Sequence, residues 1–230
     1  VEQALMEKGI PVHIETLKIS LWPRAVVTLK NVELLDPGVP PEARRPVALL
    51  HEADVALNWK ELIDGQVVPE RLNVKGLDVN LPVDAEKPER VFSTAGLNAE
   101  LDLGRPGMVD IVKADAVVQG IRVTAQGAFS IGQGDSGDFT LTAEDMAAAR
   151  EQLNQVLKYL DRVKWPEASP PSLAVNLNDD PKGGVRVGMD LQAPSLRYGK
   201  IRVRDFLFSG DYADSVIMAK RFTMRDAETA

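Results

Sequence analysis

The chain has no cysteine, and this absence excludes disulfides, zinc–thiolate sites and thiol nucleophiles together. It also lacks any run of about 18 consecutive apolar residues, the length that a membrane-spanning helix requires. Positive charge is outnumbered, with 27 lysines and arginines against 34 acids and a net charge of −7. Such a chain has no electrostatic reason to seek nucleic acid or anionic headgroups over its surface as a whole.

Catalytic motifs are absent as well. No nucleophile elbow, phosphate loop or dinucleotide fingerprint occurs, and the two histidines, His13 and His51, are interpreted as surface residues. The acidic stretch 135–138 lacks the ligand series of a calcium loop. The chain is therefore predicted to be non-catalytic, with no cofactor and no metal. A hydrolase whose acids lie far apart in the sequence is the alternative that remains open.

Alternation of apolar and polar residues dominates what is present, and this pattern is typical of strands with one buried face. The hydrophobic content of 44% and charged content of 27% are those of a folded protein. Clusters rich in glycine, proline and aspartate separate the alternating runs and predict turns. Strands are predicted at 13–21, 25–35, 47–58, 67–81, 94–103, 109–125, 128–131, 138–141, 172–177, 185–191, 200–209 and 215–223.

Two helices are predicted against this background, with one further turn at 60–64. The longer helix, 142–164, has a capping threonine, Thr142, and two acids in its first turn. Its apolar residues recur at helical spacing, and Trp165-Pro166 ends it because proline disfavours helical geometry in the residue before it. The shorter one, 1–8, stops at Gly9. The apolar face of 142–164 comprises Met146, Ala149, Leu153, Val156, Leu157, Leu160 and Val163.

One local pattern recurs five times, at 12–19, 27–34, 72–79, 116–123 and 201–208. Two apolar residues spaced by one are followed by a polar residue, a turn-forming residue, and two more apolar residues spaced by one. In a regular strand the two apolar pairs would face opposite sides of the sheet. One extra residue, accommodated as a β-bulge, places all four on the same side.

The residues that tolerate the left-handed backbone of such a bulge are Asn31, Gly76, Gly120 and Asp205. Repeated bulges add twist, so the predicted fold is mainly β: a highly twisted, curled antiparallel sheet that forms a groove, with the helix packed on it or capping it. The residues predicted to share the apolar face are Ile14, Leu17, Ile19, Val27, Leu29, Val32, Leu34, Leu72, Val74, Leu77, Val79, Leu81, Val118, Ile121 and Val123.

The segment 9–34, with its Gly-Ile-Pro-Val start and the connection Leu21-Trp22-Pro23, resembles the opening of AsmA-like proteins. Segments 53–59, 60–65 and 70–81 resemble the next section of the same family, and 163–173 is similar to a helix-to-strand junction in some bacterial members. The resemblance is carried mainly by residues 1–83.

This resemblance implies properties that composition does not show. AsmA-like and TamB-related proteins are Gram-negative envelope proteins, anchored in the inner membrane by an N-terminal helix, with a periplasmic β part. Larger members are bridge-like lipid transfer proteins whose stacked β units form a groove lined with apolar side chains. Residues 1–9 would then be the tail of the anchor helix, 10–141 a β-groove domain, 142–166 the amphipathic helix, and 167–230 further strands of a groove that continues beyond them.

The predicted function is a periplasmic module that binds phospholipid acyl chains on its apolar sheet face and contributes to lipid transport between the inner and outer membranes. Its predicted partners are phospholipid, a membrane reached through the anchor helix, and other envelope proteins, with no nucleic acid. Two alternatives stay open. The apolar residues could form a sealed core under the helix, or the chain could be an envelope scaffold or outer-membrane assembly factor that acts by protein–protein contact.

Overall fold

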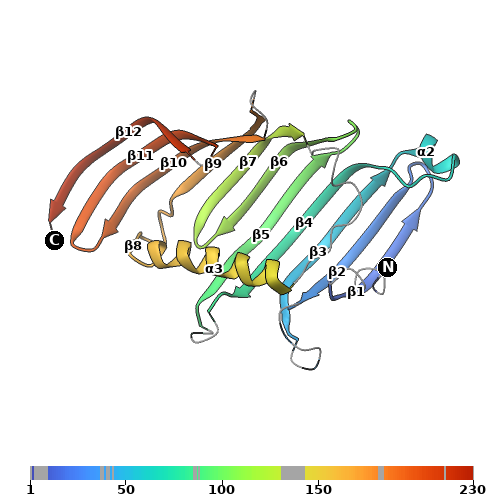
Figure 1. Cartoon of the computed structure of the whole chain (residues 1–230), viewed down its shortest axis with the longest axis horizontal. Helices are drawn as coiled ribbons and strands as arrows, with labels where there is room; N and C mark the ends of the chain where they lie inside the picture. The colour runs from blue at the N-terminus through green and yellow to red at the C-terminus, as the bar shows by residue number, and fades with distance from the viewer. Residues whose placement is uncertain are drawn as a thin grey trace.

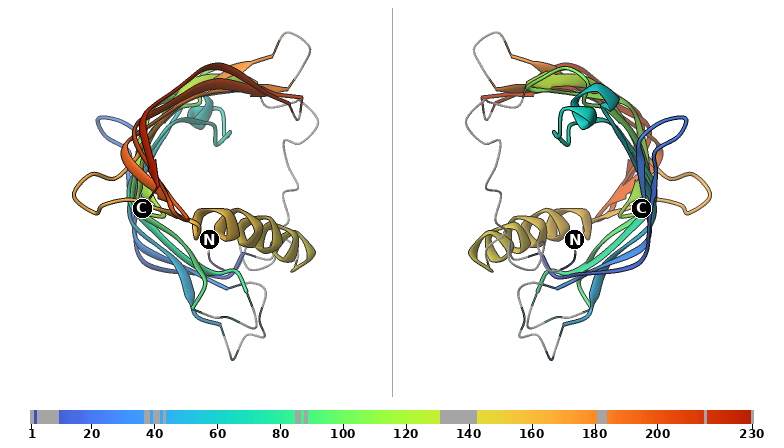
Figure 2. Two further views of the ribbon diagram at one scale, coloured as in Figure 1. Left: turned by 90° about the vertical axis from the view of Figure 1, so that its left-hand side faces the viewer. Right: turned by 90° about the vertical axis from the view of Figure 1, so that its right-hand side faces the viewer.

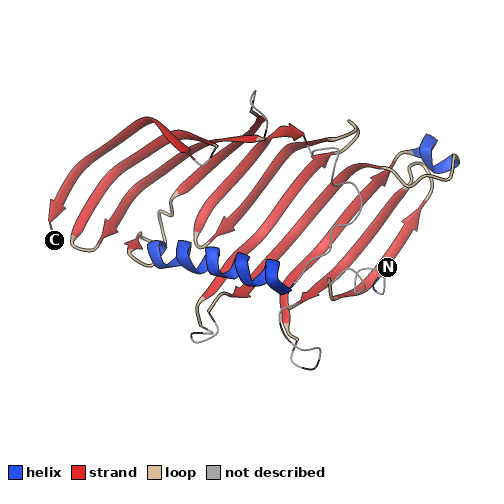
Figure 3. Ribbon diagram, in the orientation of Figure 1, coloured by secondary structure: helices blue, strands red, loops and turns tan. Residues whose placement is uncertain are grey.

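The computed structural model describes residues 2, 10–36, 39, 42, 44–84, 87, 89–130, 143–180, 184–214 and 216–229. Within these residues the chain forms one large, open sheet of twelve strands, together with helices α2 and α3 (Figures 1 and 3). The elements are β1 (Val12–Ser20), β2 (Val26–Leu35), β3 (Pro46–Leu57), α2 (Trp59–Ile63), β4 (Pro69–Pro82), β5 (Val91–Asp102), β6 (Met108–Val118), β7 (Ile121–Ser130), α3 (Ala143–Leu160), β8 (Val163–Lys164), β9 (Ser172–Asp179), β10 (Val185–Tyr198), β11 (Ile201–Ala213) and β12 (Val216–Thr229).

The strand order follows the sequence almost throughout. Strands β1 to β7 form an antiparallel meander, and β9 to β12 form a second one. The two meanders join where β7 and β9 pair in parallel, because the connection through α3 returns the chain to the same edge. The short strand β8 pairs with the C-terminal end of β10, on the same side of β10 as β9, which pairs with the earlier residues of that strand.

Seen along the row of strands, the ribbons follow an arc, and α3 lies on the inner side of that arc (Figure 2). The first and last strands of the row, β1 and β12, lie at opposite ends and do not pair with one another. The sheet is therefore open, with two edge strands.

Most predicted strands are confirmed to within a few residues, but three predictions are wrong. The predicted strand 109–125 is two strands, β6 and β7, joined by a two-residue turn at Gln119 and Gly120, both with positive φ. Residues 128–130 of the predicted separate strand 128–131 are the end of β7, and residue 131 lies outside the described residues. The predicted helix 142–164 ends at Leu160, because Val163 and Lys164 pair with Tyr198 and Arg197 of β10 instead.

The remaining helix predictions differ in outcome. The turn at 60–64 is helix α2, which begins after Asn58, whose side chain accepts a hydrogen bond from the backbone N–H of Glu61 at 3.1 Å. The capping residue Thr142, the predicted strand 138–141 and all of the predicted helix 1–8 except Glu2 lie outside the described residues.

The closed core is small. Its centre is a cluster of Val47, Leu81, Val83 and Leu157, where α3 meets the ends of β3 and β4. Among the described residues no large side chain is completely buried. The accessible surface is 14979 Å², whereas a compact monomer of this mass exposes about 10,300 Å². An open sheet accounts for this excess, since most of its side chains have neighbours beside them but nothing above them.

Candidate functional site

The strand register brings the predicted apolar residues together in rows that cross the sheet. In the first row Ile14 pairs with Val32, Val32 with Leu50, and Leu50 with Leu77. Leu77 pairs in turn with Leu97 of β5. Residues paired in this way point to the same face of a sheet, so five strands contribute one continuous apolar row.

Further rows run alongside the first. One joins Leu17, Leu29, Ala53, Val74 and Ala99. Three others complete the predicted set: Ile19, Val27, Val55, Leu72 and Leu101; Val12, Leu34, Ala48, Val79, Thr94, Val118 and Ile121; and Leu81 with Phe92. Val123 pairs with Ala116 of β6 and Leu173 of β9.

The row of Ile14 and the row of Leu17 share a face because the strands are irregular between them. Asn31 and Gly76 both have positive φ, at 49° and 66°, and the β4–β5 register shifts between Val74 and Leu77. Both predicted bulge positions are confirmed as irregular. Asp205 has φ 49° beside a register shift in β11 and is confirmed too.

Gly120 is the exception among the predicted bulges. Its φ is positive, at 79°, but it lies in the turn between β6 and β7 rather than inside a strand. Val118 and Ile121 are therefore direct cross-strand partners. The four apolar residues of this copy share a face because a tight hairpin pairs them, so the expected result has a different cause.

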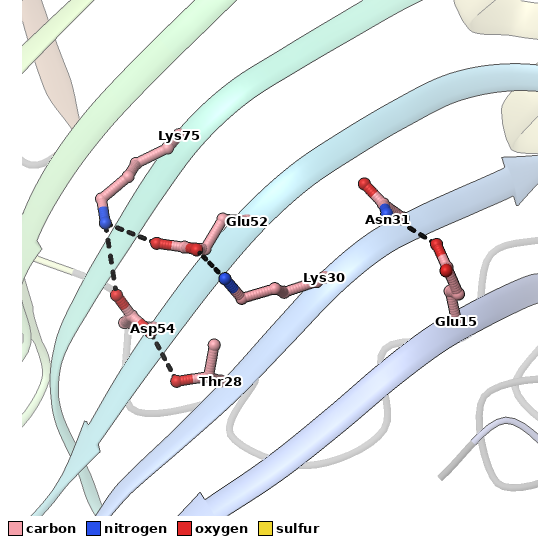
Figure 4. Close-up of polar contacts among 7 residues, drawn as sticks. All are labelled: Glu15, Thr28, Lys30, Asn31, Glu52, Asp54 and Lys75. Atoms are coloured by element: carbon pink, nitrogen blue, oxygen red, sulfur yellow. Dashed lines mark hydrogen bonds and ion pairs between the residues drawn. The ribbon is translucent and has the colours of Figure 1, made fainter.

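The opposite face of β2, β3 and β4 is polar. Glu52 accepts from Lys30 at 2.7 Å and from Lys75 at 2.5 Å, and Asp54 accepts from the Thr28 hydroxyl at 2.7 Å (Figure 4). These partners come from adjacent strands and lie side by side on one face. The apolar rows consequently occupy the other face without interruption by charge.

The two lysines beside Glu52 lower the pKa of its carboxyl to about 2, chiefly through the hydrogen bond from Lys30 and then the one from Lys75. The same contact with Glu52 raises the pKa of Lys75. Hydrogen bonds from the Ser130 backbone and hydroxyl lower the pKa of Asp179 at the end of β9. All three groups stabilise pairing between strands, and none has the unpaired, buried setting of a catalytic acid or base.

The histidines behave as predicted. His13 is 64% exposed, with Glu2 at 3.5 Å, and His51 is 53% exposed, with Asp78 at 3.4 Å. Within the described part of the chain no three potential ligands gather to hold a metal ion. No described helix has the length and hydropathy to cross a bilayer.

Exposure differs along the apolar face. Leu81 is buried at 8%, Leu17 and Ile19 are exposed at 40% and 63%, and the rest of the predicted set is half-buried. A sealed core would bury these side chains almost completely. Among the described residues the face is therefore most deeply buried near α3 and partly exposed over the rest of the sheet.

Helix α3 covers one end of the face. Met146, Leu153, Leu157 and Leu160 pack against the cluster of Val47, Leu81 and Val83, as predicted. Val156 of the same predicted face is instead 52% exposed, and Ala149 is exposed too. Fewer apolar residues of α3 are packed than predicted, because only one side of the helix contacts the sheet.

Two ion pairs fasten the helix at the rim of the sheet. Arg150 of α3 contacts Asp36 at 2.5 Å, and both side chains are largely buried. Arg90, before β5, contacts Asp161 at 2.6 Å and Asn154 at 3.2 Å. These contacts hold α3 across the strand ends. In this position the helix covers one end of the apolar face and leaves the rest of the face free of helix.

Apolar residues of β9 to β12 that were not in the predicted set continue the face. Leu173 pairs with Leu191, Leu191 with Phe208, and Phe208 with Phe222. Residues 167–230 were expected to add strands to the groove, and alternation in 172–177 and 185–191 was the available signal for their apolar side chains. The sequence did not predict that these strands join the first meander through the parallel pairing of β7 with β9.

Comparison with protein-family models, curated proteins and solved structures found no match to this chain.

Proposed function

We propose that this chain is a groove-forming module of an AsmA-like envelope protein, which holds phospholipid acyl chains along its apolar sheet face. The observation that carries the proposal is the set of apolar rows that cross neighbouring strands while most of their side chains stay half-buried. A soluble monomer rarely leaves so large an apolar patch uncovered unless something binds there.

Acyl chains suit this face on physical grounds. They need a dry, continuous surface and no directed polar contacts, and each buried methylene contributes about 0.8 kcal/mol. Burying ten methylenes along the rows would contribute roughly 8 kcal/mol before the cost of ordering the chain. The polar face, with its paired charges, faces water while the apolar face holds lipid.

The curled groove belongs to the same proposal. Asn31, Gly76 and Asp205 have left-handed backbones of the kind that add twist to a strand. The arc of the ribbons agrees with a groove whose inner side is apolar (Figure 2). Helix α3 then acts as a partial cap. The resemblance to AsmA-like proteins supports a periplasmic location, an inner-membrane anchor before the β part and a non-catalytic role in lipid transport between membranes.

A second candidate function is protein–protein contact through the sheet edge. Strand β12 is an edge strand whose Ile217 is 61% exposed and whose Phe222 is 56% exposed. An edge of this kind can add a strand from a partner. In this alternative the chain is an envelope scaffold and its apolar face is covered by protein.

Native mass spectrometry after detergent-free purification tests the proposal. We expect co-purifying phospholipid in the wild type and its loss in Val74→Asp, which places a charge in the middle of a row. The matched control is Val117→Asp, since Val117 is 41% exposed and pairs with Arg122 on the opposite face. A lipid-free wild type, or equal lipid loss in both variants, would contradict the groove and favour the scaffold.

A further inference from the structure

Five cations lie on one face of the sheet where β8, the end of β10, the start of β11 and the end of β12 meet. The register pairs Lys164 with Arg197, Arg197 with Arg202, and Arg204 with Arg225. Arg202 and Arg204 are two residues apart on β11, so all five belong to the same face. We call these residues the basic strip.

The basic strip differs from the rest of the polar face. Like charges directly opposite one another destabilise a sheet, whereas on β2, β3 and β4 cations alternate with an acid in the row of Lys30, Glu52 and Lys75 (Figure 4). Among the side chains that the structure describes, which do not include those of residues 226–230, the five strip cations have no ion-pair partner. Such repulsion persists where an anionic ligand offsets it.

Three acids lie near the strip. Glu228 is opposite Arg202 in the register, Asp205 follows Arg204 in sequence, and Asp226 follows Arg225. The five cations outnumber these acids, in a chain whose overall charge is −7. This end of the sheet therefore has a local excess of positive charge.

The adjoining hairpin turn, Gly199 and Lys200, is flanked by two exposed apolar or aromatic side chains. Tyr198 and Ile201 close β10 and β11 and are 49% and 47% exposed, and Gly199 between them takes a left-handed turn with φ 58°. The turn lies at the same border of the sheet as β8 and the end of α3 (Figure 1). Tyrosine and isoleucine beside arginines form the combination that enters the interfacial zone of a bilayer.

A shallow depression of about 360 Å³ lies among Lys164, Trp165, Arg197, Arg202 and Arg204. Trp165 closes one side of it and approaches the β6–β7 turn, where a Cβ on Gly120 would lie 3.6 Å from the indole nitrogen. The depression is open and flanked by several guanidinium groups. It therefore suits the phosphates of a headgroup layer better than one enclosed small molecule.

We infer that the β10–β11 hairpin docks onto the surface of an anionic phospholipid bilayer. The basic strip attracts the headgroup phosphates, and Tyr198 and Ile201 enter the interface. The inference does not depend on acyl chains occupying the apolar face, since the strip lies on the other face of the sheet.

Vesicle co-sedimentation at low and high salt tests the inference, using the full chain. We expect binding to phosphatidylglycerol-containing vesicles, weak binding to pure phosphatidylcholine vesicles, and loss of binding as salt screens the charges. Arg197→Gln with Arg202→Gln should weaken binding about thirtyfold, since each cation near such a surface contributes about fivefold. Ile201→Ser should weaken binding to the same vesicles without changing its salt dependence.

The matched control is Lys18→Gln with Lys113→Gln, which removes the same charge from exposed lysines on β1 and β6. Equal loss in the control pair, equal binding to both vesicle types, or no vesicle binding by the wild type would overturn the inference. Binding to a short DNA duplex in place of vesicles would also overturn it. Co-purified phospholipid measured on the same variants keeps the two proposals apart: the strip variants should retain it, and its absence with intact vesicle binding would overturn the groove alone.

Discussion

The two ends of the apolar face differ in how deeply their side chains are buried. Beside α3, Val47 and Leu81 are at most 8% exposed. Farther from the helix, Leu17 and Ile19 carry the same kind of side chain on the same face and are 40% and 63% exposed. The residue types and the strand periodicity do not distinguish these regions; the helix above one of them and the edge position of β1 do.

This difference separates structural burial from surface available to a ligand. The covered end holds α3 and the strand ends together, so changes there should act on stability. The uncovered rows are held by backbone pairing with neighbouring strands, so changes there should act on what the face binds.

The largest effect is expected for Leu157→Asp. Leu157 is 4% exposed in the cluster under α3, and an unpaired charge buried there costs several kcal/mol, a large part of a domain's stability. Thermal unfolding should show a Tm lower by about ten degrees or more. Val156→Asp is the matched control, because Val156 is 52% exposed on the same helix and should unfold like the wild type. Similar Tm values for the two variants would mean that α3 is not packed on the sheet.

A second, smaller effect is expected at the irregular positions that keep both regions on one face. Gly76→Val forces a branched side chain into φ 66° and places its Cβ 2.7 Å from the His51 ring, so we expect a loss of about 1–3 kcal/mol. Gly96→Val has a similar φ of 61° but open space around it. Chemical denaturation gives the free energy of unfolding of both variants. The loss in Gly96→Val measures backbone strain alone, and any additional loss in Gly76→Val measures the steric clash with His51.

Removing the His51 ring refines that measurement. His51→Ala in the Gly76→Val background should restore part of the lost free energy of unfolding. The part restored should equal the amount by which the loss in Gly76→Val exceeds the loss in Gly96→Val. If Gly76→Val proves as stable as the wild type, the left-handed residue does not constrain β4.

A third effect, smaller still in stability, is expected for Val74→Asp and Leu77→Asp in the uncovered rows. Both side chains are half-buried, so we expect a loss of about 1 kcal/mol each and a Tm lower by a few degrees. A decrease in Tm as large as that of Leu157→Asp would show that these residues belong to the core. The two ends of the face would then not differ in burial as described above.

The smallest effect is expected from acid on the polar face. The folded pKa of Glu52 is about 2, below its usual 4.5, so its contribution to stability is present above the usual value and is lost as the pH falls through the folded one. Because the pair is near the surface, the loss should be about one or two degrees in Tm. Glu52→Gln should reduce the slope of Tm against pH between about pH 5 and 2. An unchanged slope would mean that this carboxyl does not contribute to the loss of stability in acid.

Part of the fold could be predicted because it depends on local pattern. Alternation placed β1 to β5 to within a few residues, and the turn-forming residues Asn31, Gly76 and Asp205 marked true irregularities. These features follow from strand periodicity and from the few residues that tolerate a left-handed backbone, and both are visible along the chain. Gly120 shows the limit: the same signal fits a bulge or a hairpin turn, and only partner strands distinguish them.

The amino-acid sequence by itself determined that the chain would form strands with one apolar and one polar face, because side-chain alternation is a local property. Tertiary structure alone decided the parallel joining of β7 with β9, the narrow line of contact under α3, and the gathering of Arg197, Arg202, Arg204 and Arg225 on neighbouring strands. The physical reason is common to all three. Pairing between strands distant in sequence sets which side chains become neighbours, and neighbours decide whether an apolar residue is core or surface and whether a charge is neutralised.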